Sequence, residues 1–315
     1  MKPKFHMHPG VGWSATTPFY YTLQHLNRYM TTGVTKEIQY WALASRENTF
    51  DYNRYREKRL SRTLYQKGLK IKEPPLAKKL HQDVFTKPWL ERWYSPPFSI
   101  EKYVEYFLLL NECKDDFTAV GDFSTYNVDI PDAFLCSIAE KLLEHFDVKV
   151  TITFADPITR FYYEVGRLCG ERQYGTLAAL GKQQKLFMSH IDNKKFESTD
   201  FDRHNVDYAQ TYNKYCKAFG KDNVLPIIME DFWEPKKEKE QKDRLSKFIG
   251  YQIEKIHPNV FWPLSNKDST YLKDQSNCLR EPLTPKLIEY AKEPMKHFYD
   301  DWLKVLPMPE SWNYD

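Results

Sequence analysis

Residues 5–23 read FHMHPGVGWSATTPFYYTL, and this stretch decides the fold. Phe5–His8 is strand-like, the next four residues are rich in turn formers, and Phe19–Met30 is an apolar run typical of a helix. Thr17 is a good N-cap for that helix, and Pro18 fits its first turn. A strand, a glycine loop and a helix in this order present backbone N–H groups to an anion, so we expect the functional site here.

The loop offers both backbone and side-chain groups to an anion. Gly10 and Gly12 let the backbone approach an anion closely. Ser14, Thr16 and Thr17 add hydroxyl donors. The nucleotide P-loop pattern needs a Lys before its Ser or Thr, and the loop has none there. On the loop alone, an anion site and an ordinary turn are both open.

Strand-like and helix-like segments alternate along the rest of the chain. Val148–Phe154 (VKVTITF) is β-branched and almost continuously apolar, as buried parallel strands are. Asn223–Met229 is a second such strand, in which Pro226 indicates an edge or a bulge. Thr118–Gly121 is a short strand, and helices are predicted at 101–112, 131–146, 157 onward, 207–218, 234–247 and 285–305. The alternation predicts one α/β domain over residues 1–315, with a central parallel sheet covered by helices on both faces.

Composition narrows the class of protein. The 315 residues are 41% hydrophobic and 16% aromatic, which allows a sizeable core. The net charge is +3 and the Lys and Arg residues are scattered, so we expect neither a nucleic acid nor a membrane as partner. Five widely spaced cysteines without a CxxC pattern indicate a reducing compartment and no zinc site. With no secretory signal and no run near the roughly 20 apolar residues of a membrane helix, we expect a cytoplasmic protein.

Five segments occur in the order and approximate spacing of one known family. They are FHMHPGVGWSATTPFYYTL (5–23), TKEIQYW (35–41), VGDFSTY (120–126), FADPITRFYY (154–163) and DNVLPIIMEDF (222–232). Together they resemble the PAPS-dependent sulfotransferases, closest in pattern to the carbohydrate and bacterial branches (PAPS is 3′-phosphoadenosine 5′-phosphosulfate). The resemblance implies a three-layer, P-loop-like sulfotransferase fold. It also implies PAPS as co-substrate, no metal, and a carbohydrate or small-molecule acceptor.

The sequence departs from the family at the positions that normally hold PAPS. Trp13 stands where the family has a Lys or Arg beside the phosphosulfate, and Ala15 replaces a Gly. Phe123 stands where a second Lys is common. Ala155 and Tyr163 replace the Arg and the Ser of the 3′-phosphate segment. A hydrogen bond between charged groups contributes roughly 1.5–3 kcal/mol, so these losses would weaken PAPS binding by orders of magnitude unless other residues compensate.

Several residues are candidates to compensate. The resemblance places Arg160 at the second Arg of the 3′-phosphate segment, and an ordinary helix-surface Arg is the alternative. A late basic loop covers the nucleotide in several branches, which makes Lys273 and Arg280 candidates, with solvated cations as the alternative. The predicted binding set is therefore Gly10, Gly12, Trp13, Ser14, Ala15, Thr16, Thr17, Arg160, Tyr163, Lys273 and Arg280.

Three residues are candidates for the catalytic base that accepts the acceptor's proton. Glu37 comes first, because it matches the Glu that serves as base in the glycosaminoglycan branch. Asp122 aligns with a family Glu and either acts as base or organises its loop. His8 lies beside the anion loop and would be a base or the missing cation, against an ordinary packed His. We place His6 and His8 on opposite faces of their strand, which argues against a shared metal site.

Three hypotheses for function follow. The first is sulfuryl transfer from PAPS to a hydroxyl or amine of a carbohydrate or small molecule. The second is a non-catalytic sulfotransferase-like domain that has lost the PAPS-binding cations and binds a ligand or partner. The third is another P-loop-like transferase or kinase.

An aromatic segment, residues 85–107, offers rings for stacking on a sugar or for core packing (Phe85, Trp89, Trp93, Tyr94 and Phe98). Phe134 is expected on the apolar side of helix 131–146.

Overall fold

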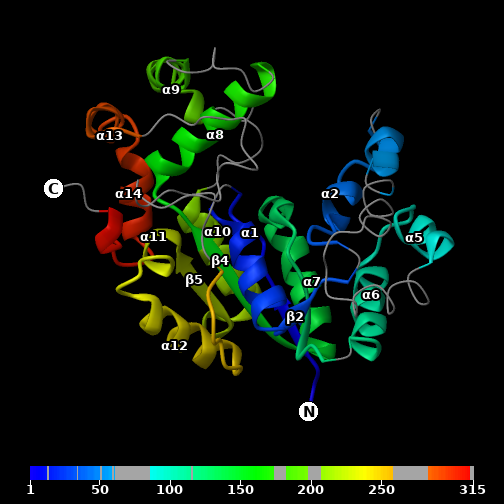
Figure 1. Cartoon of the computed structure of the whole chain (residues 1–315). Helices are drawn as coiled ribbons and strands as arrows, with labels where there is room; N and C mark the ends of the chain where they lie inside the picture. The colour runs from blue at the N-terminus through cyan, green and yellow to red at the C-terminus, as the bar shows by residue number, and fades with distance from the viewer. Residues whose placement is uncertain are drawn as a thin grey trace.

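Among the described residues, the computed structural model has a central sheet of five parallel strands in the order β2-β3-β1-β4-β5 (Figure 1). It describes residues 1–312 except 13, 34, 50, 51, 59, 61–85, 115, 174–181, 198–206 and 258–282. The strands are β1 (Lys4–Met7), β2 (Met30–Thr31), β3 (Ala119–Asp122), β4 (Asp147–Phe154) and β5 (Val224–Ile228). Pro226 lies in β5 at an edge of this sheet, where the missing N–H interrupts no ladder on the outer side.

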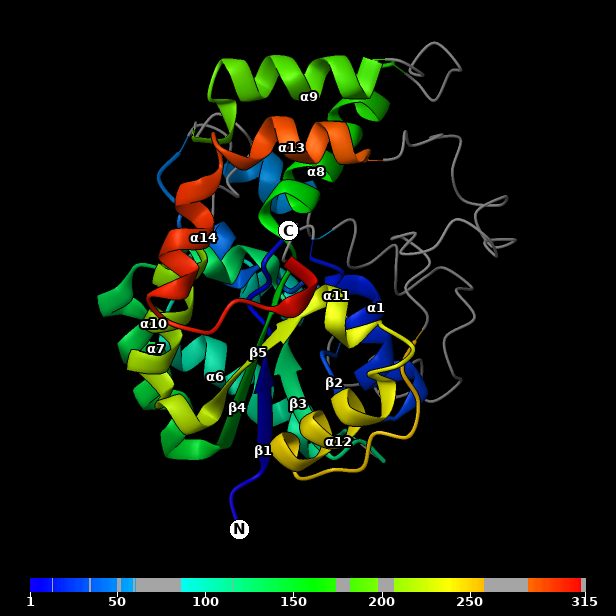
Figure 2. The same ribbon diagram turned by 90° about the vertical axis from the view of Figure 1, so that its left-hand side faces the viewer.

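Helices cover both faces of the sheet, as Figure 2 shows with the sheet nearly edge-on. One face carries α1 (Thr16–Tyr21), α11 (Met229–Phe232) and α12 (Glu238–Ile249), joined by a buried cluster that includes Phe19, Phe123 and Leu245. The other face carries α6 (Ile100–Glu112), α7 (Asp132–His145), α10 (Tyr208–Phe219) and α14 (Lys296–Leu303) over a larger buried cluster. This confirms the predicted three-layer α/β architecture.

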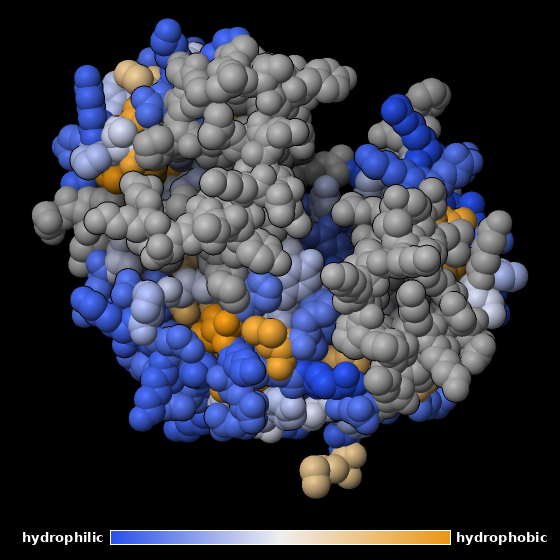
Figure 3. Space-filling view, in the orientation of Figure 1, coloured by the Kyte–Doolittle hydropathy of each residue, from blue (hydrophilic) through white to orange (hydrophobic). Residues whose placement is uncertain are grey.

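Two further groups of helices rise beyond the carboxyl ends of the strands. On one side, α8 (Pro157–Gln173), α9 (Lys182–Asp192) and α13 (Pro285–Lys292) share a small apolar core around Phe161 and Phe187. On the other side lie α2 (Tyr40–Ala44) and α5 (Lys87–Trp93) (Figure 1). The molecular surface is hollowed between these two groups, as the space-filling view in Figure 3 shows. Within the described residues, no helix combines the length and apolarity that crossing a membrane requires.

Two predicted helices were wrong in extent. The apolar run 19–30 is α1, a π-helical turn (Thr22–Leu26) and then β2, with Ala15 rather than Thr17 as N-cap at φ 53°. The helix ends because Asn27 Nδ2 donates to the Thr22 carbonyl at 2.6 Å and the next residue takes a φ of 50°. The predicted helix 285–305 is broken into α13 and α14, since Pro294 between them has no N–H to continue the ladder.

Candidate functional site

The loop after β1 is fixed to the neighbouring strand by its own backbone. Val11 N donates to the Thr153 carbonyl and Thr153 N donates to the Gly10 carbonyl, both at 2.9 Å. Gly10 has a φ of 125°, and a Cβ there would lie 3.1 Å from the Gly12 nitrogen, so this position requires glycine. The loop therefore enters α1 in a defined shape at the carboxyl end of the sheet.

Arg160 holds the loop from the side of α8. Its Nε donates to the Gly12 carbonyl at 2.9 Å, and its Nη2 lies 4.0 Å from Glu164 Oε2. The side chain is only 8% exposed. The ordinary helix-surface alternative for this residue was wrong. In the structure Arg160 binds the loop backbone, which is one of the groups that would shape an anion site.

A cation reaches the loop from a different segment than the family pattern implies. Lys36 Nζ donates to Thr17 Oγ1 at 2.9 Å and to Thr16 Oγ1 at 3.3 Å. Ser14 Oγ is buried beside the Tyr208 hydroxyl, which interacts with it, and makes no closer hydrogen bond among the described residues. An anion held here would give this hydroxyl a closer partner. Lys36 lies next to Glu37 in the sequence, but the sequence analysis did not select it.

Glu37 belongs to a chain of contacts that joins three of the five family-like segments. Its Oε1 lies 3.9 Å from Lys36 Nζ, and its Oε2 accepts from Gln39 Nε2 at 2.5 Å. The Gln39 backbone N–H donates to Ser124 Oγ at 2.8 Å, and Ser124 Oγ donates to Asp122 Oδ1 at 2.5 Å. The predicted base is thus half-buried beside the loop and oriented by fixed partners.

Asp122 is buried at the end of β3 and is surrounded by donors. Besides Ser124, Tyr103 OH donates to its Oδ2 at 2.7 Å and Asn127 Nδ2 at 3.0 Å. Burial raises the pKa of this carboxyl, and these hydrogen bonds oppose the rise. An acceptor of three internal hydrogen bonds is better suited to organising the loop, the alternative role, than to meeting a substrate.

His6 and His8 share one face of β1, so the expectation of opposite faces was wrong. Their rings contact the same atom, Thr151 Oγ1, at 2.8 and 3.0 Å, because residues two apart in a strand point the same way. Both are fully buried, and His8 stacks on Phe123 with centroids 4.2 Å apart. Burial lowers the pKa of His6 to about 3 and that of His8 well below its usual value. Neutral His8 therefore does not supply the missing cation.

The predicted 3′-phosphate side is apolar in the described residues. Ala155 is fully buried and Tyr163 is 7% exposed, in one cluster with Ala15 and Met229. Beside them the acidic side chain of Glu230 accepts from the Asp156 N–H at 2.9 Å. Burial, and then the nearby Asp156, raise the pKa of Glu230 to about 8. Neither group adds positive charge on this side.

Three predicted binding residues, Trp13, Lys273 and Arg280, lie outside the described residues. Among the residues that the structure does describe, no three His, Cys, Asp or Glu side chains are grouped as a metal site would need. The sequence analysis missed Lys36, Gln39 and Ser124. Their positions inside two of the quoted segments were the available signal, but their contacts depend on the folded arrangement.

Comparison with solved structures finds sulfotransferases. The crystal structure of a sulfotransferase from Alicyclobacillus acidocaldarius matches with a TM-score of 0.51 and 14% identity, over 99% of both chains. The sulfotransferase domain of the Synechococcus PCC 7002 olefin synthase matches with a TM-score of 0.46 and 12% identity, over 97% of this chain and 96% of that one. The sulfotransferase domain from the curacin biosynthetic pathway matches with a TM-score of 0.43 and 11% identity, over 98% and 99%.

In sequence, no protein-family profile matches the chain, and no curated protein matches it. The likeness is therefore one of structure, and in the Alicyclobacillus acidocaldarius protein it extends over essentially the whole of both chains. This chain has the α/β fold of sulfotransferases.

Proposed function

We propose that this protein transfers the sulfuryl group of PAPS to a hydroxyl or amine of a carbohydrate or small molecule. One observation carries the proposal: Lys36 Nζ lies on the hydroxyls of Thr17 and Thr16, next to Glu37. A cation beside the loop and a carboxylate beside the cation are the two groups that sulfuryl transfer needs. Of the two, Lys36 takes the place of the loop cation of the family pattern, where this chain has Trp13.

The loop residues fit the 5′ end of PAPS. The buried Ser14 Oγ, the two threonine hydroxyls and Lys36 would bind its anionic phosphosulfate. Arg160 would act indirectly, because it holds the Gly12 carbonyl and so keeps the loop in shape. These groups come from the loop, from residue 36 and from α8, and Lys36 and Arg160 are each held by a contact that does not involve the ligand.

PAPS supplies an activated sulfuryl group whose bridging S–O bond breaks, with the electron pair leaving on the nucleotide. An acceptor oxygen or nitrogen forms the new bond to sulfur. In this chain Glu37 takes the proton from the acceptor, and Lys36 stabilises the negative charge that grows at the loop. Gln39, Ser124 and Asp122 fix the direction of the Glu37 carboxylate through successive hydrogen bonds.

A second function is favoured by the apolar cluster on the opposite side. Ala155, Tyr163, Ala15 and Met229 form a buried surface where the family holds the 3′-phosphate. The loss of the family's Arg and Ser at these positions suits a sulfotransferase-like domain that binds a ligand or partner elsewhere without transferring a group. The two functions differ in whether the adenosine bisphosphate product of PAPS binds at all.

The test is calorimetric titration of the purified protein with 3′,5′-bisphosphate adenosine, with ATP as control. We expect micromolar affinity for the bisphosphate and much weaker binding of ATP. Folding is checked on the same sample by circular dichroism. A folded protein that binds neither nucleotide at millimolar concentration would contradict the transferase and favour the binding domain. Tighter binding of ATP would favour a kinase-like activity instead.

A further inference from the structure

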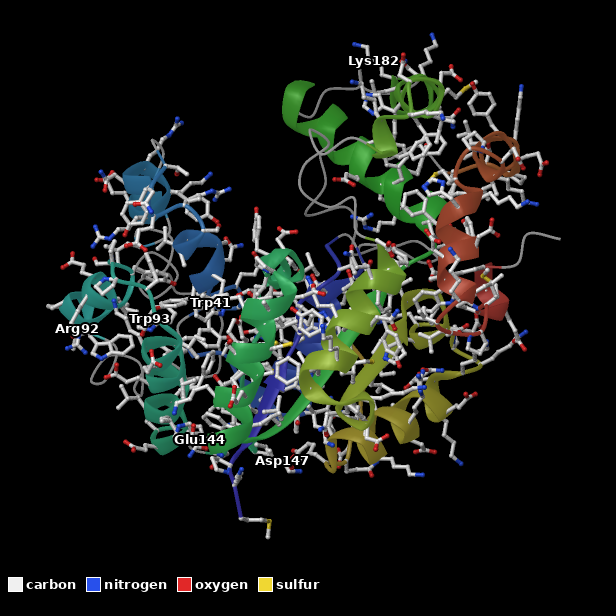
Figure 4. The ribbon with its side chains drawn as sticks, turned by 180° about the vertical axis from the view of Figure 1, so that it is seen from behind. Trp41, Arg92, Trp93, Glu144, Asp147 and Lys182 are labelled. Atoms are coloured by element: carbon white, nitrogen blue, oxygen red, sulfur yellow. The ribbon has the colours of Figure 1, made fainter. Side chains whose placement is uncertain are left out.

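A cavity of about 590 Å³ lies between α2, the segment that follows β3 and the first turn of α7. Its size is within the range of about 300–1,000 Å³ that takes small organic ligands. Trp41 forms part of its wall, and Figure 4 shows this residue beneath α2, close to the ends of α6 and α7. The cavity is at the same edge of the sheet as the anion loop, since β3 ends and α7 begins there.

Aromatic rings dominate the wall. They belong to Trp41, Phe98, Tyr126 and Phe134. Trp41 is 5% exposed, and its ring packs against Tyr103 at a centroid distance of 4.9 Å, so its orientation is fixed. Rigid rings on a cavity wall bind flat, apolar ligand faces at low entropic cost.

Phe134 is the exception to the predicted burial of its helix. The sequence pattern placed it on the apolar side of α7, but in the structure it is 39% exposed, with its ring edge-on to Trp41 at 4.9 Å and 89°. Because this exposed ring lies on the cavity wall, its face is available to a ligand there. Of the predicted stacking residues, Trp93 and Tyr94 are buried core residues, whereas Phe98 lines this cavity.

The charged groups of the wall have both signs. Arg46 stacks on Tyr55 with its guanidinium carbon 4.1 Å from the ring centroid, and its buried Nη1 has no hydrogen-bond partner among the described residues. Glu47 and Asp129 add two carboxyl groups. A cationic ligand would be repelled by Arg46, and an anionic ligand would be repelled by the two carboxyl groups. A neutral ligand with several hydroxyls can donate to the carboxyl groups and accept from the guanidinium.

The cavity adjoins the proposed base along the chain on two sides. Gln39, which donates to Glu37, directly precedes α2, and the cavity-lining residues Trp41 and Ala42 follow it. Ser124, which accepts from Gln39, precedes the lining residue Tyr126 by two positions. A ligand in this cavity is therefore bounded by the same two segments that orient Glu37.

We infer that this cavity binds a neutral sugar or glycoside, whose C–H face stacks on the aromatic wall and whose hydroxyls meet Arg46, Glu47 and Asp129. The role of this sugar as sulfuryl acceptor rests on the proposed function, but its binding does not. The inference excludes uronate-rich and other anionic glycans, because two of the three charged lining groups are carboxyl groups.

The experiment is saturation-transfer NMR on the full chain without nucleotide. The probes are lactose, maltose and cellobiose, with glucuronic acid, glucosamine and phenol as an anion, a cation and a plain aromatic. We expect at least one neutral disaccharide to bind more tightly than all three comparison compounds. Failure of every neutral disaccharide to bind, or a preference for any comparison compound, would overturn the inference.

Two variants test the location. Phe134→Ala removes a stacking ring and Arg46→Gln removes the unpartnered donor, and each should weaken disaccharide binding about tenfold. Tyr290→Ala on α13 is the matched control, because that ring is 37% exposed and is not part of the cavity wall. Thermal melting checks that each variant is folded. If wild-type affinity survives in both cavity variants, the sugar binds elsewhere and the inference is wrong.

The bisphosphate titration on the same samples separates this inference from the proposed function. Sugar binding without any binding of 3′,5′-bisphosphate adenosine would support the sugar site and contradict the sulfotransferase. Nucleotide binding without sugar binding would do the reverse. If both bind, incubation with PAPS should yield a sulfated disaccharide, and Phe134→Ala should raise KM for the sugar more than it lowers kcat.

Discussion

The loop side of the proposed PAPS site has a cation on its hydroxyls, whereas on the opposite side, at the start of α8, an apolar cluster replaces the family's ligands and Arg160 is tied to the loop backbone. On the loop side Lys36 Nζ lies 2.9 Å from Thr17 Oγ1, and the Ser14 hydroxyl is buried beside them. On the α8 side Ala155 and Tyr163 pack with Met229. Both sides depart from the family pattern, and within the part of the chain that the structure describes only the loop side regains a cation from another segment.

The difference shows which kind of substitution a binding site can absorb. An anion is held by charge within a few ångströms, so Lys36 can act from a neighbouring segment in place of a loop Lys or Arg. An apolar cluster leaves no comparable freedom, because a charge brought into it would have to be desolvated. We therefore expect the loop side to dominate nucleotide affinity, and the predictions below test that imbalance.

The largest effect is expected from Lys36→Met. Loss of this charged donor should weaken binding of 3′,5′-bisphosphate adenosine about 10- to 100-fold, as expected for one charge-assisted hydrogen bond. Calorimetric titration measures the change. Lys237→Met is a matched control, since Lys237 is also ion-paired, with Asp231 at 2.9 Å, but lies outside the loop. Equal affinities of the two variants would place the cation elsewhere.

Glu37→Gln separates binding from chemistry at the adjacent position. It retains the size and the hydrogen-bonding capacity of the side chain but removes the proton acceptor. We expect bisphosphate affinity within about threefold of wild type and a turnover lower by about 10²- to 10⁴-fold, as for other general bases. An unchanged turnover would remove Glu37 as the base. Such a result would leave the role of Lys36 in binding intact.

The sequence predicted much of the fold because its signals are local. The continuous apolar run 148–154 and the strand–loop–helix order at residues 5–23 correspond to β4 and to β1, the loop and α1. Pro294 also indicates a helix break in the sequence, but the predicted helix 285–305 ran through it. Local patterns of this kind depend on a few consecutive residues. Tertiary contacts changed only where the predicted helices and strands end.

The site could be predicted only in part because its decisive contacts join distant residues. Glu37 was found by its segment, but Lys36 reaches Thr17 across 19 positions in the chain. The exposure of Phe134 depends on the cavity beside Trp41, and the periodicity of a helix in the sequence does not predict that cavity. The error over the His6 side chain was different, since the two-residue period of a strand already placed it on the face of His8.

A smaller effect is expected on stability when the pH is lowered, because His6 in β1 is buried. His6 is buried with a pKa of about 3, below the usual 6.5, so the folded state binds fewer protons than the unfolded state between these values. Stability is therefore fully present above about pH 6.5 and falls as the pH decreases towards 3. Between pH 7.5 and 5.5 we expect one such histidine to cost about 1.4 kcal/mol in the free energy of unfolding.

Urea unfolding of wild type and His6→Gln at these two pH values measures that cost. Glutamine can keep the contact with Thr151 Oγ1 but does not titrate. The decrease in unfolding free energy should therefore be smaller in the variant by about the cost of one histidine. Parallel pH profiles for the two proteins would show that His6 is protonated in the folded state or exposed to water, contrary to its complete burial.

The smallest effect is expected on the α8 side, from the 3′-phosphate itself. Adenosine 5′-monophosphate and 3′,5′-bisphosphate adenosine differ only in that group. On this side Ala155, Tyr163 and Met229 carry no positive charge, and Arg160 is already held by the Gly12 carbonyl and lies 4.0 Å from Glu164. We expect their affinities, measured by the same titration, to differ by less than about tenfold. That is less than the gain in affinity from one charge-assisted hydrogen bond. A much larger ratio would break the comparison between the two sides. It would favour Arg160, or the sequence-predicted Lys273 and Arg280, as ligands of the 3′-phosphate.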